Sequence, residues 1–277
     1  MEEKMNETPA PEQGENNIPT REERRERRER GPKLPPFTRS GVLLIDKPAT
    51  WTSHDVVAFI RSRFRVQKAG HCGTLDPAAT GLLVVVLGKF TKLSQTFSGE
   101  DKVYKATILL GTETDSQDMD GNIVKTSDPS GITKEMFLET LQSFIGKQKQ
   151  TPPMVSAVKK DGARLYELAR KGVEVEREPK DIEIYAIDVE SIDLPYATFR
   201  VSCSKGTYIR TLCSDIGAKL GCGAALYSLQ RLKSGEFELD HAHTIEELKN
   251  WTQDDLSNCI ADFLHAKLAK MNKFSAF

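Results

Sequence analysis

The chain has 277 residues, enough for one medium-sized domain or two small ones with a substantial core. Its 39 basic and 40 acidic residues give a formal net charge of −1, so a nucleic-acid partner requires a local basic face. No stretch approaches the ~20 apolar residues of a membrane span, and the N-terminus lacks an apolar signal region. We therefore expect a soluble, cytoplasmic protein with no membrane contact.

Cysteine spacing excludes two further classes of protein. The five cysteines are odd in number and include no Cys-x-x-Cys pair, so neither a disulfide framework nor a zinc site is expected. They are predicted to be buried free thiols. The five are Cys72, Cys203, Cys213, Cys222 and Cys259.

The first 40 residues are predicted to form a disordered, charged tail. They hold nine Lys/Arg, nine Asp/Glu and six prolines with almost no aliphatic residues, so they cannot bury enough apolar surface to offset the entropy of ordering. The alternating charges of 21–30 favour a transient helix through i,i+4 pairs. A solvated linker is the favoured interpretation, and an RNA tether is the alternative.

Order is predicted to begin with a short apolar strand at 41–48 that ends in a turn. Ser53 is positioned to cap the next helix. An irregular loop at 70–81 then leads into a buried strand at 82–87, and a further strand at 102–110 carries alternate apolar residues on one face. The helix that Ser53 is expected to cap has an apolar face with Val56, Val57, Ile60 and Phe64.

The acidic segment 112–121 superficially suggests a calcium loop. With Gly121 at the sixth position, Ser116 would stand first and Ser127 twelfth, where calcium loops need a bidentate Glu. We therefore reject calcium and expect a solvated hairpin rich in carboxylates.

The second half of the chain interleaves helices and strands without a βαβ rhythm, which favours one domain with a mixed sheet flanked by helices. An apolar helical stripe from Ile209 to Leu220 stops at Gly221, a good C-terminal signal. The other predicted elements are a helix at 133–145 closed by Gly146, strands at 181–190 and 197–203, and helices at 244–251 and 256–270.

Asp76 lies in the most informative segment of the chain. The loop 70–81 gathers three glycines, a proline, a histidine and this single carboxylate directly before an apolar run. Glycine and proline shape irregular backbone, and such loops concentrate functional groups. Asp before Pro is also common turn chemistry. Local composition alone leaves a capping role and a catalytic role about equally supported.

A second candidate segment, Lys205 to Thr211, opens a predicted helix. Helix N-termini attract anions, and Lys205 and Arg210 add positive charge there. Tyr208 beside Arg210 offers a stacking face and a cationic fork, as needed to hold a base and a phosphate. A plain helix start with a surface Arg remains the alternative. Basic residues also bracket the Asp76 loop: Arg61, Arg63, Arg65, Lys68, Lys89 and Lys92.

Taken together, the ordered motifs from Gly41 to about Lys233 resemble the TruB-type tRNA pseudouridine synthases, which convert uridine 55 of the T loop. The motifs are Asp46-Lys47-Pro48, Gly70-His71-x-Gly-x-Leu-Asp76-Pro77, Tyr104 in Val-Tyr-Lys, Thr114-Asp115-x-x-Asp118-x-Asp120-Gly121, Pro152-x-x-Ser156-Ala157, Tyr166-x-x-Ala169-Arg170-x-Gly172, Cys203 to Thr211, and Leu229-x-Arg-Leu232.

The resemblance implies an α+β pseudouridine synthase fold with a mixed, mostly antiparallel sheet, as a catalytic domain at 41–240. The family commonly carries a C-terminal PUA domain. Residues 241–277 are expected to form only a short helical extension, with no full PUA domain, and the basic segment 21–30 is a possible substitute for its RNA contacts.

The resemblance also implies roles for individual residues. Asp76 would be the nucleophile, Tyr104 would stack on the uracil, and Arg210 with Asp118 would position Asp76. A paired Arg210 would favour ionised Asp76 at neutral pH. The substrate-binding residues would be His71, Tyr104, Tyr208, Leu229, Lys47 and Pro48.

The implied reaction isomerises uridine after base flipping. Attack at C1′, addition at C6 and proton abstraction from the sugar all remain open. The implied partner is tRNA through its T stem-loop, with no cofactor, no metal, no obligatory protein partner and a monomeric state. The alternatives are an RNA-binding or tRNA-folding module without catalysis, and a guide-dependent pseudouridine synthase acting on rRNA. Intact Asp76, Tyr104, Asp118 and Arg210 argue against the first, and the missing PUA domain argues against the second.

Overall fold

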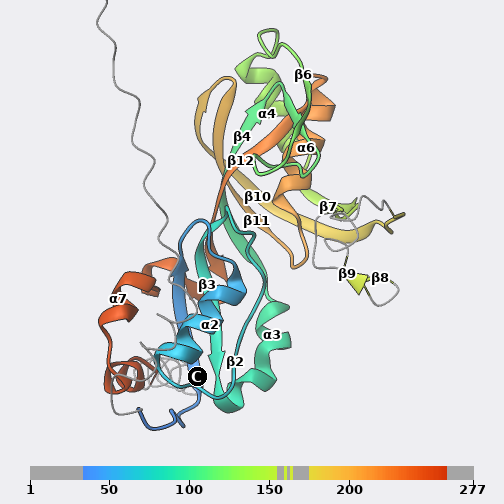
Figure 1. Ribbon diagram of the computed structural model, residues 1–277. Coiled ribbons are helices and arrows are strands. Elements are labelled where there is room, and N and C mark those ends of the chain that lie inside the picture. The colour runs from blue at the N-terminus through green and yellow to red at the C-terminus, as the bar shows by residue number, and fades with distance from the viewer. Residues whose placement is uncertain (1–33, 155–158, 161–162, 165–174, 261–277) are drawn as a thin grey trace, which may run out of the picture. The chain divides into compact units, whose positions relative to one another are not determined.

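The protein is described here by a computed structural model, which defines residues 34–154, 159–160, 163–164 and 175–260 (Figure 1). The compact unit begins at Pro36. Of the expected tail at 1–40, residues 1–33 lie outside the described residues, whereas Phe37 is buried in the compact unit and pairs with Val66. The distal part of the expected helix 256–270 and the motif residues Ser156, Ala157 and Tyr166 to Gly172 also lie outside the described residues.

A ten-stranded mixed sheet organises this unit, in the order β14-β1-β3-β12-β4-β11-β10-β7, with β2 paired to β3 and β13 to β12. All its pairs are antiparallel except β1 with β14 and β3 with β12. The predicted α+β class and mixed, mostly antiparallel sheet are therefore confirmed. The strands are β1 Gly41–Lys47, β2 Ala69–His71, β3 Thr80–Leu87, β4 Lys102–Leu110, β7 Gly146–Gln150, β10 Lys180–Asp193, β11 Tyr196–Cys203, β12 Ala224–Ser234, β13 Phe237–Glu238 and β14 His243–Thr244.

Helices cover the sheet at both of its ends. They are α2 Ser53–Arg63, α3 Ser94–Ser98, α4 Lys134–Gln142, α6 Ile209–Leu220 and α7 Ile245–Asn250, with 3₁₀ turns η1 Gly88–Leu93 and η2 Leu239–His241 and a last helix at 253–260. Two short hairpins pair β5 Thr112–Thr114 with β6 Ile123–Thr126, and β8 Lys159–Lys160 with β9 Ala163–Arg164. No helix in the described ranges has the length and apolarity to cross a bilayer.

Two large hydrophobic clusters lie at different parts of the sheet. One packs α4 and α6 against β4, β10 and β11, around Ile108, Phe137 and Phe199. The other packs α2, α7 and the last helix against β1 and β3. Tyr104 and Leu229 are half-buried and pack against both clusters. The junction between the two clusters is therefore a place where polar groups from both halves can meet.

Strand β12 was not predicted from the sequence, in which Leu229-x-Arg-Leu232 was identified only as a motif. It runs through the middle of the sheet between β3 and β4. Two bulges, between Leu226 and Ser228 and between Arg231 and Lys233, break the alternation of its side chains. Because β-bulges shift the two-residue period, the strand lacks the pattern on which the prediction relied.

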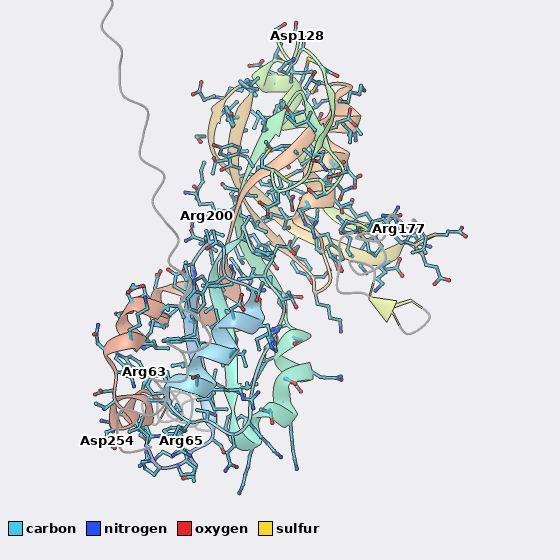
Figure 2. All side chains as sticks on the ribbon, in the orientation of Figure 1. Arg63, Arg65, Asp128, Arg177, Arg200 and Asp254 are labelled. Carbon is cyan, nitrogen blue, oxygen red and sulfur yellow. The ribbon has the colours of Figure 1, made fainter. Side chains whose placement is uncertain are left out.

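The predicted cap of α2 was wrong by one residue. Thr52 is the N-cap: its hydroxyl accepts from the Asp55 backbone N–H while the Asp55 carboxylate accepts from the Thr52 N–H. Ser53 is instead buried and bonds to Leu75. At the other end of α2, the Arg63 guanidinium donates to the carbonyls of Lys249 and Trp251, which ties α2 to the end of α7. Arg63 is labelled in Figure 2.

The predicted helix 133–145 is shorter than expected. Thr133 caps α4 as its N-cap, but the helix ends at Gln142. Gly146 starts β7 with a positive φ of 112° instead of closing the helix. The predicted stop of α6 at Gly221 is confirmed, since this residue has the left-handed φ of 80° that favours glycine.

Candidate active site

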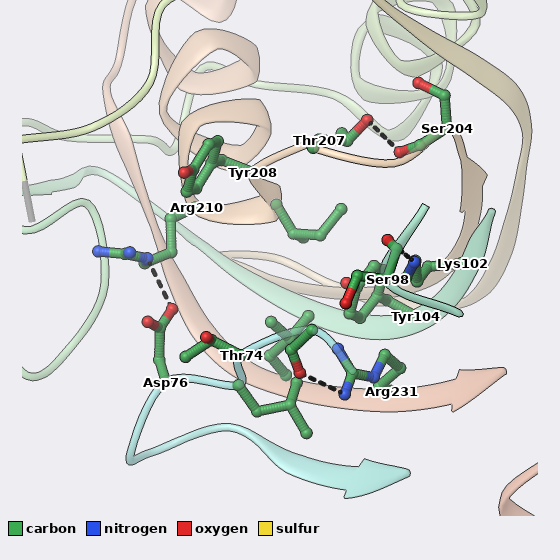
Figure 3. A pocket seen from close by; sticks show the side chains of 15 residues that line it. Thr74, Asp76, Ser98, Lys102, Tyr104, Ser204, Thr207, Tyr208, Arg210 and Arg231 are labelled. Atoms are coloured by element: carbon green, nitrogen blue, oxygen red, sulfur yellow. Dashed lines mark hydrogen bonds and ion pairs between the residues drawn. The ribbon is translucent and has the colours of Figure 1, made fainter. Parts of the chain in front are cut away.

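A cavity of about 260 Å³ opens at the junction of the two clusters (Figure 3). It is bounded by the loop after β2, the start of β4, the turn that precedes α6, and β12. Its lining residues are Gly73, Thr74, Leu75, Asp76, Ser98, Lys102, Tyr104, Ser204, Gly206, Thr207, Tyr208, Ile209, Arg210, Leu229 and Arg231.

The backbone around Asp76 is fixed from both sides. Ser53 on α2 accepts from the Leu75 N–H at 2.9 Å and donates to the Leu75 carbonyl at 3.1 Å. On the other side, the fully buried Lys47 donates to the Pro77 carbonyl at 3.1 Å and to the carbonyls of Pro48 and Trp51. The loop therefore presents the Asp76 carboxylate from a defined backbone position.

Arg210 joins two carboxylates that are distant in sequence. Its side chain is only 4% exposed, and its Nε lies 3.1 Å from Asp76 Oδ2 and 3.5 Å from Asp118 Oδ2. A second guanidinium nitrogen donates to the Ser116 carbonyl at 3.0 Å. The pairing with Asp76 is drawn in Figure 3. Because the guanidinium is held at several points, it orients the Asp76 carboxylate toward the cavity.

Asp118 is held by the acidic hairpin between β5 and β6. The Ser116 hydroxyl donates to its carboxylate, and the Thr114 hydroxyl donates to its backbone carbonyl at 2.7 Å. The tip of this hairpin is attached to β12, because the Leu226 N–H donates to the Gln117 carbonyl at 3.0 Å. The predicted hairpin thus carries one carboxylate into the site.

Tyr104 and Arg231 face each other across β4 and β12. Arg231 is 1% exposed; its Nε donates to the Leu82 carbonyl at 2.7 Å and its Nη2 to the Gly73 carbonyl at 3.1 Å. The Arg231 guanidinium also lies beside the Tyr104 hydroxyl, and burial raises the pKa of Tyr104 above its ordinary value while the charge of Arg231 opposes this rise. Arg231 therefore links the aromatic wall of the cavity to the loop of Asp76.

Gln150 holds the backbone of Tyr208 at the start of α6. Its amide oxygen accepts from the Tyr208 N–H at 2.8 Å, and its amide nitrogen donates to the Tyr208 carbonyl at 3.0 Å. Gln150 is 4% exposed, so these bonds are shielded from water. Tyr208 needs this support because α6 has no side-chain cap at its N-terminus.

The expected effect of Arg210 on Asp76 is outweighed. Burial raises the pKa of Asp76 above its ordinary value, Arg210 opposes this rise, and the charges of Asp118 and Asp120 add to it. Although 43% of the Asp76 side chain is accessible, Asp76 lines the cavity, and the surrounding protein still partly desolvates its carboxylate. The net direction is upward, contrary to the expectation from pairing alone.

The structure brings five of the nine sequence-derived site residues to the cavity wall: Asp76, Tyr104, Tyr208, Arg210 and Leu229. Asp118 lies behind Arg210. Lys47, Pro48 and His71 do not line the cavity. Lys47 supports the loop from beneath, and His71 sits half-buried in β2 opposite Val85.

Three residues that line or support the cavity were not predicted from the sequence as site residues: Lys102, Gln150 and Arg231. Lys102 stands two residues before Tyr104 and so shares its face of β4. Arg231 belongs to the Leu229-x-Arg-Leu232 motif, but no role was predicted for it because strand β12 was not predicted. In the described ranges, no group of three or more His, Cys, Asp or Glu side chains has an arrangement suited to a metal ion.

Comparison with known families identifies this architecture. The model described as TruB family pseudouridylate synthase (N terminal domain) matches residues 61–209. The model of the tRNA pseudouridylate synthase B C-terminal domain matches residues 210–266. The chain belongs to the TruB family of pseudouridylate synthases. The boundary between the two matches falls at Arg210, beside the Asp76 carboxylate.

Curated members of the TruB family match most of the chain. The protein named tRNA pseudouridine synthase B from Syntrophotalea carbinolica is 50% identical over 216 residues, which cover 78% of this chain and 71% of that protein. Its namesake from Geobacter sulfurreducens is 52% identical over 209 residues, covering 76% and 69%.

Solved structures of two related assemblies share the fold. A chain of a Cbf5-Nop10-Gar1 complex is 32% identical with a TM-score of 0.61, covering 76% of this chain and 54% of that chain. A chain of an H/ACA RNP bound to a substrate RNA containing 2′-deoxyuridine is 28% identical with a TM-score of 0.58, covering 76% and 53%. This chain thus spans about half the length of these two solved relatives.

Proposed function

We propose that this protein isomerises uridine to pseudouridine at position 55 in the T loop of tRNA. The observation that carries the proposal is the Asp76 carboxylate, paired at 3.1 Å with Arg210 in a cavity bounded by Tyr104 and Tyr208. This site occurs in a chain whose sequence is 50% and 52% identical to two proteins named tRNA pseudouridine synthase B.

Binding begins with extrusion of the target uridine from the T loop, at a cost of a few kcal/mol. A cavity of about 260 Å³ accepts a single base with its ribose but not a paired duplex. The uracil stacks on Tyr104, and Tyr208 with the backbone at Leu229 closes the base pocket. His71, which does not line the cavity, contacts the RNA beside the extruded nucleotide.

Asp76 then acts on the bound nucleotide. Its carboxylate attacks C1′, adds at C6 or removes a sugar proton, so that the N1–C1′ bond opens. The uracil turns and its C5 bonds to C1′ as any bond to the Asp76 carboxylate breaks. The C5 hydrogen then leaves as a proton and N1 takes up a proton. Arg210 and Asp118 hold the carboxylate in place, and Lys47 and Pro48 support its loop.

The reaction redistributes bonds within one nucleoside, so no oxidant, group donor or cofactor enters its balance. We propose that the protein works as a monomer in the cytoplasm, recognises the T stem-loop and requires no protein partner. Domain boundaries at 41–240 for catalysis and 241–277 for a helical extension are part of the same proposal.

Mapping the position of pseudouridine in the RNA product tests which uridine the protein modifies. Pure protein is incubated with an unmodified tRNA transcript, with an isolated T stem-loop, and with a transcript carrying cytidine at position 55. Pseudouridine is then located by carbodiimide labelling and primer extension. A stop one nucleotide 3′ of position 55, which marks pseudouridine at 55, is expected in the first two RNAs and not in the third. Modification elsewhere contradicts the T-loop assignment. Binding without modification favours an RNA-binding module, and no action on tRNA by the protein alone favours a guide-dependent enzyme.

A further inference from the structure

Two buried cations line the cavity without a counter-ion. Lys102 is 6% exposed and Arg231 is 1% exposed, and neither forms an ion pair with a carboxylate of the described residues. Burying a charge is costly unless a partner compensates it. Two of the five donors of Arg231 bond to the backbone of the Asp76 loop and of β3, so its guanidinium supports the protein structure. Lys102 bonds to neither of these segments, so it can serve a ligand without releasing the Asp76 loop.

The ammonium of Lys102 uses only part of its hydrogen-bonding capacity. It donates to the Ser98 carbonyl at 2.8 Å and to the Glu100 carbonyl. An ammonium has three donors, so one remains. Lys102 itself lines the cavity, and Figure 3 shows it on the far side from Asp76 in that view. The remaining donor can therefore serve a molecule bound in the cavity.

The position of Lys102 relative to the aromatic wall suggests which part of a ligand it reaches. Lys102 and Tyr104 are two residues apart on β4, so their side chains leave the same face of the strand. Arg231 lies opposite Tyr104 on β12. A uracil stacked on Tyr104 would thus have two positive charges beside it, with Asp76 toward the ribose.

The proposed isomerisation creates negative charge on that ring. When the N1–C1′ bond opens, its electron pair stays on uracil and spreads over N1, O2 and O4. Addition of a carboxylate at C6 likewise moves an electron pair toward O4. The charge is discharged when C5 bonds to C1′, the C5 proton departs and N1 takes up a proton. Every route left open by the sequence passes through an electron-rich uracil.

We propose that Lys102 is a further catalytic residue, whose ammonium stabilises the negative charge on the uracil ring while it is detached from C1′. The inference rests on the proposed function. A preorganised donor aimed at developing charge in a cavity shielded from water is among the strongest catalytic devices, and removal of one such donor typically costs about 10²–10³-fold in rate.

Lys102 is also poised to titrate in an accessible range. Burial, and then the charge of Arg231, lowers its pKa to about 8, while Glu100, Cys203 and Asp101 oppose the change. The same ammonium could contact a phosphate of the RNA, which is charged in both the ground state and the transition state. Ground-state binding and transition-state stabilisation are separable by experiment.

The test uses full-length protein carrying Lys102→Met or Lys102→Arg. Lys105→Met is the matched control on the same strand, because Lys105 is 44% exposed and pairs with Glu190. Single-turnover rates at saturating tRNA and dissociation constants are measured for each. We expect Lys102→Met to lower the rate roughly 10²-fold with an unchanged Kd. Lys102→Arg should retain most of the rate, and Lys105→Met should match the wild type.

Three outcomes overturn the inference while leaving the proposed function intact. The first is an active wild type with an unchanged Lys102→Met rate. The second is a raised Kd with an unchanged rate, which assigns Lys102 to a phosphate. The third is an equal loss in Lys102→Arg with a lowered melting temperature, which assigns it to structure. An inactive wild type instead contradicts the proposed function itself.

A substrate whose uracil is a better leaving group provides an independent test of Lys102. Fluorine at C5 stabilises a uracil anion, so consumption of a transcript with 5-fluorouridine at position 55 should depend less on Lys102. The ratio of wild-type to Lys102→Met rates should be smaller for this RNA than for uridine. In addition, the wild-type rate should fall above about pH 8, and Lys102→Arg should move that fall upward. Equal ratios for the two RNAs contradict the inference.

Discussion

At the scale of single residues, Asp76 carries two opposing electrostatic demands. It needs its charge to react, yet burial and the neighbouring Asp118 raise its pKa. Arg210 offsets part of this rise and fixes the direction of the carboxylate. A carboxylate that is poorly solvated but still ionised is a stronger nucleophile and base than one in water, which makes the conflict useful for catalysis.

The raised pKa predicts the acid limb of the pH profile. Because the ionised form reacts, the single-turnover rate should fall as pH decreases through the pKa of Asp76. That limb should lie above the ordinary aspartate value of 3.8. The measurement is the rate at saturating RNA across the acid range, with circular dichroism at each pH to show that the protein stays folded. A limb at or below 3.8 contradicts the assignment.

At the scale of elements, α2 supports the reactive loop through adjacent residues with different tasks. Thr52 caps the helix, whereas Ser53 makes two hydrogen bonds to Leu75, next to Asp76. Thr52→Ala should lower the free energy of unfolding by about 1 kcal/mol, as lost caps do, with the rate unchanged. Ser53→Ala should lower the single-turnover rate as well, because the loop loses its anchor. Urea titrations and rate measurements compare the two variants; equal rates would contradict this division of tasks.

The acidic hairpin is a second element whose backbone reaches the site. A Cβ on Gly121 would lie 2.2 Å from Ser116 Oγ and 2.3 Å from Asp115 Oδ1. Gly121→Ala should therefore displace the Ser116 hydroxyl that orients Asp118 and reduce the rate about tenfold or more, since small misplacements cost up to ~10²-fold. Gly131→Ala is the control, because nothing lies within 4 Å of its Cβ. Similar rates for both variants would show that the hairpin does not position Asp118.

Regular periodicity explains which elements were predictable. The strands at 82–87 and 102–110 and the helix ending before Gly221 follow uninterrupted patterns, and all three are present. The cap of α2 was misplaced because Thr52 and Ser53 are both good caps, and only the buried contact with Leu75 separates them. Strand β12 was overlooked because its two bulges disrupt the alternation of its side chains.

Side-chain partners across the fold were harder to predict than elements. The proximity of Asp76, Asp118 and Arg210 was inferred from family resemblance, since no local pattern links residues so far apart. Gln150 and Arg231 show the limit: their importance lies in bonds to the backbone of Tyr208 and Gly73. Such bonds leave no periodic trace in the sequence. The pKa of Asp76 was also missed, because pairing was foreseen but desolvation was not.

At the scale of the whole molecule, the described site is contained in the compact unit that begins at Pro36. Deletion of residues 1–33 should therefore leave the single-turnover rate at saturating tRNA unchanged. The affinity for tRNA in the same comparison tests the proposed tether at 21–30, since Lys/Arg contacts to phosphates weaken with salt. A large loss of rate would show that the N-terminal segment takes part in catalysis, and equal affinities at every salt concentration would rule out the tether.

The central claim is that Asp76 performs the isomerisation, and tritium release from C5-labelled uridine in an unmodified tRNA transcript tests it most directly. Wild-type protein alone should release the label, and Asp76→Asn should release none while binding the RNA. Asp76→Asn should also be at least as stable as wild type at pH 7. The native pKa lies above the unfolded value, so the ionised carboxylate destabilises the fold there. Release by a folded Asp76→Asn variant at a rate near that of the wild type would contradict the account.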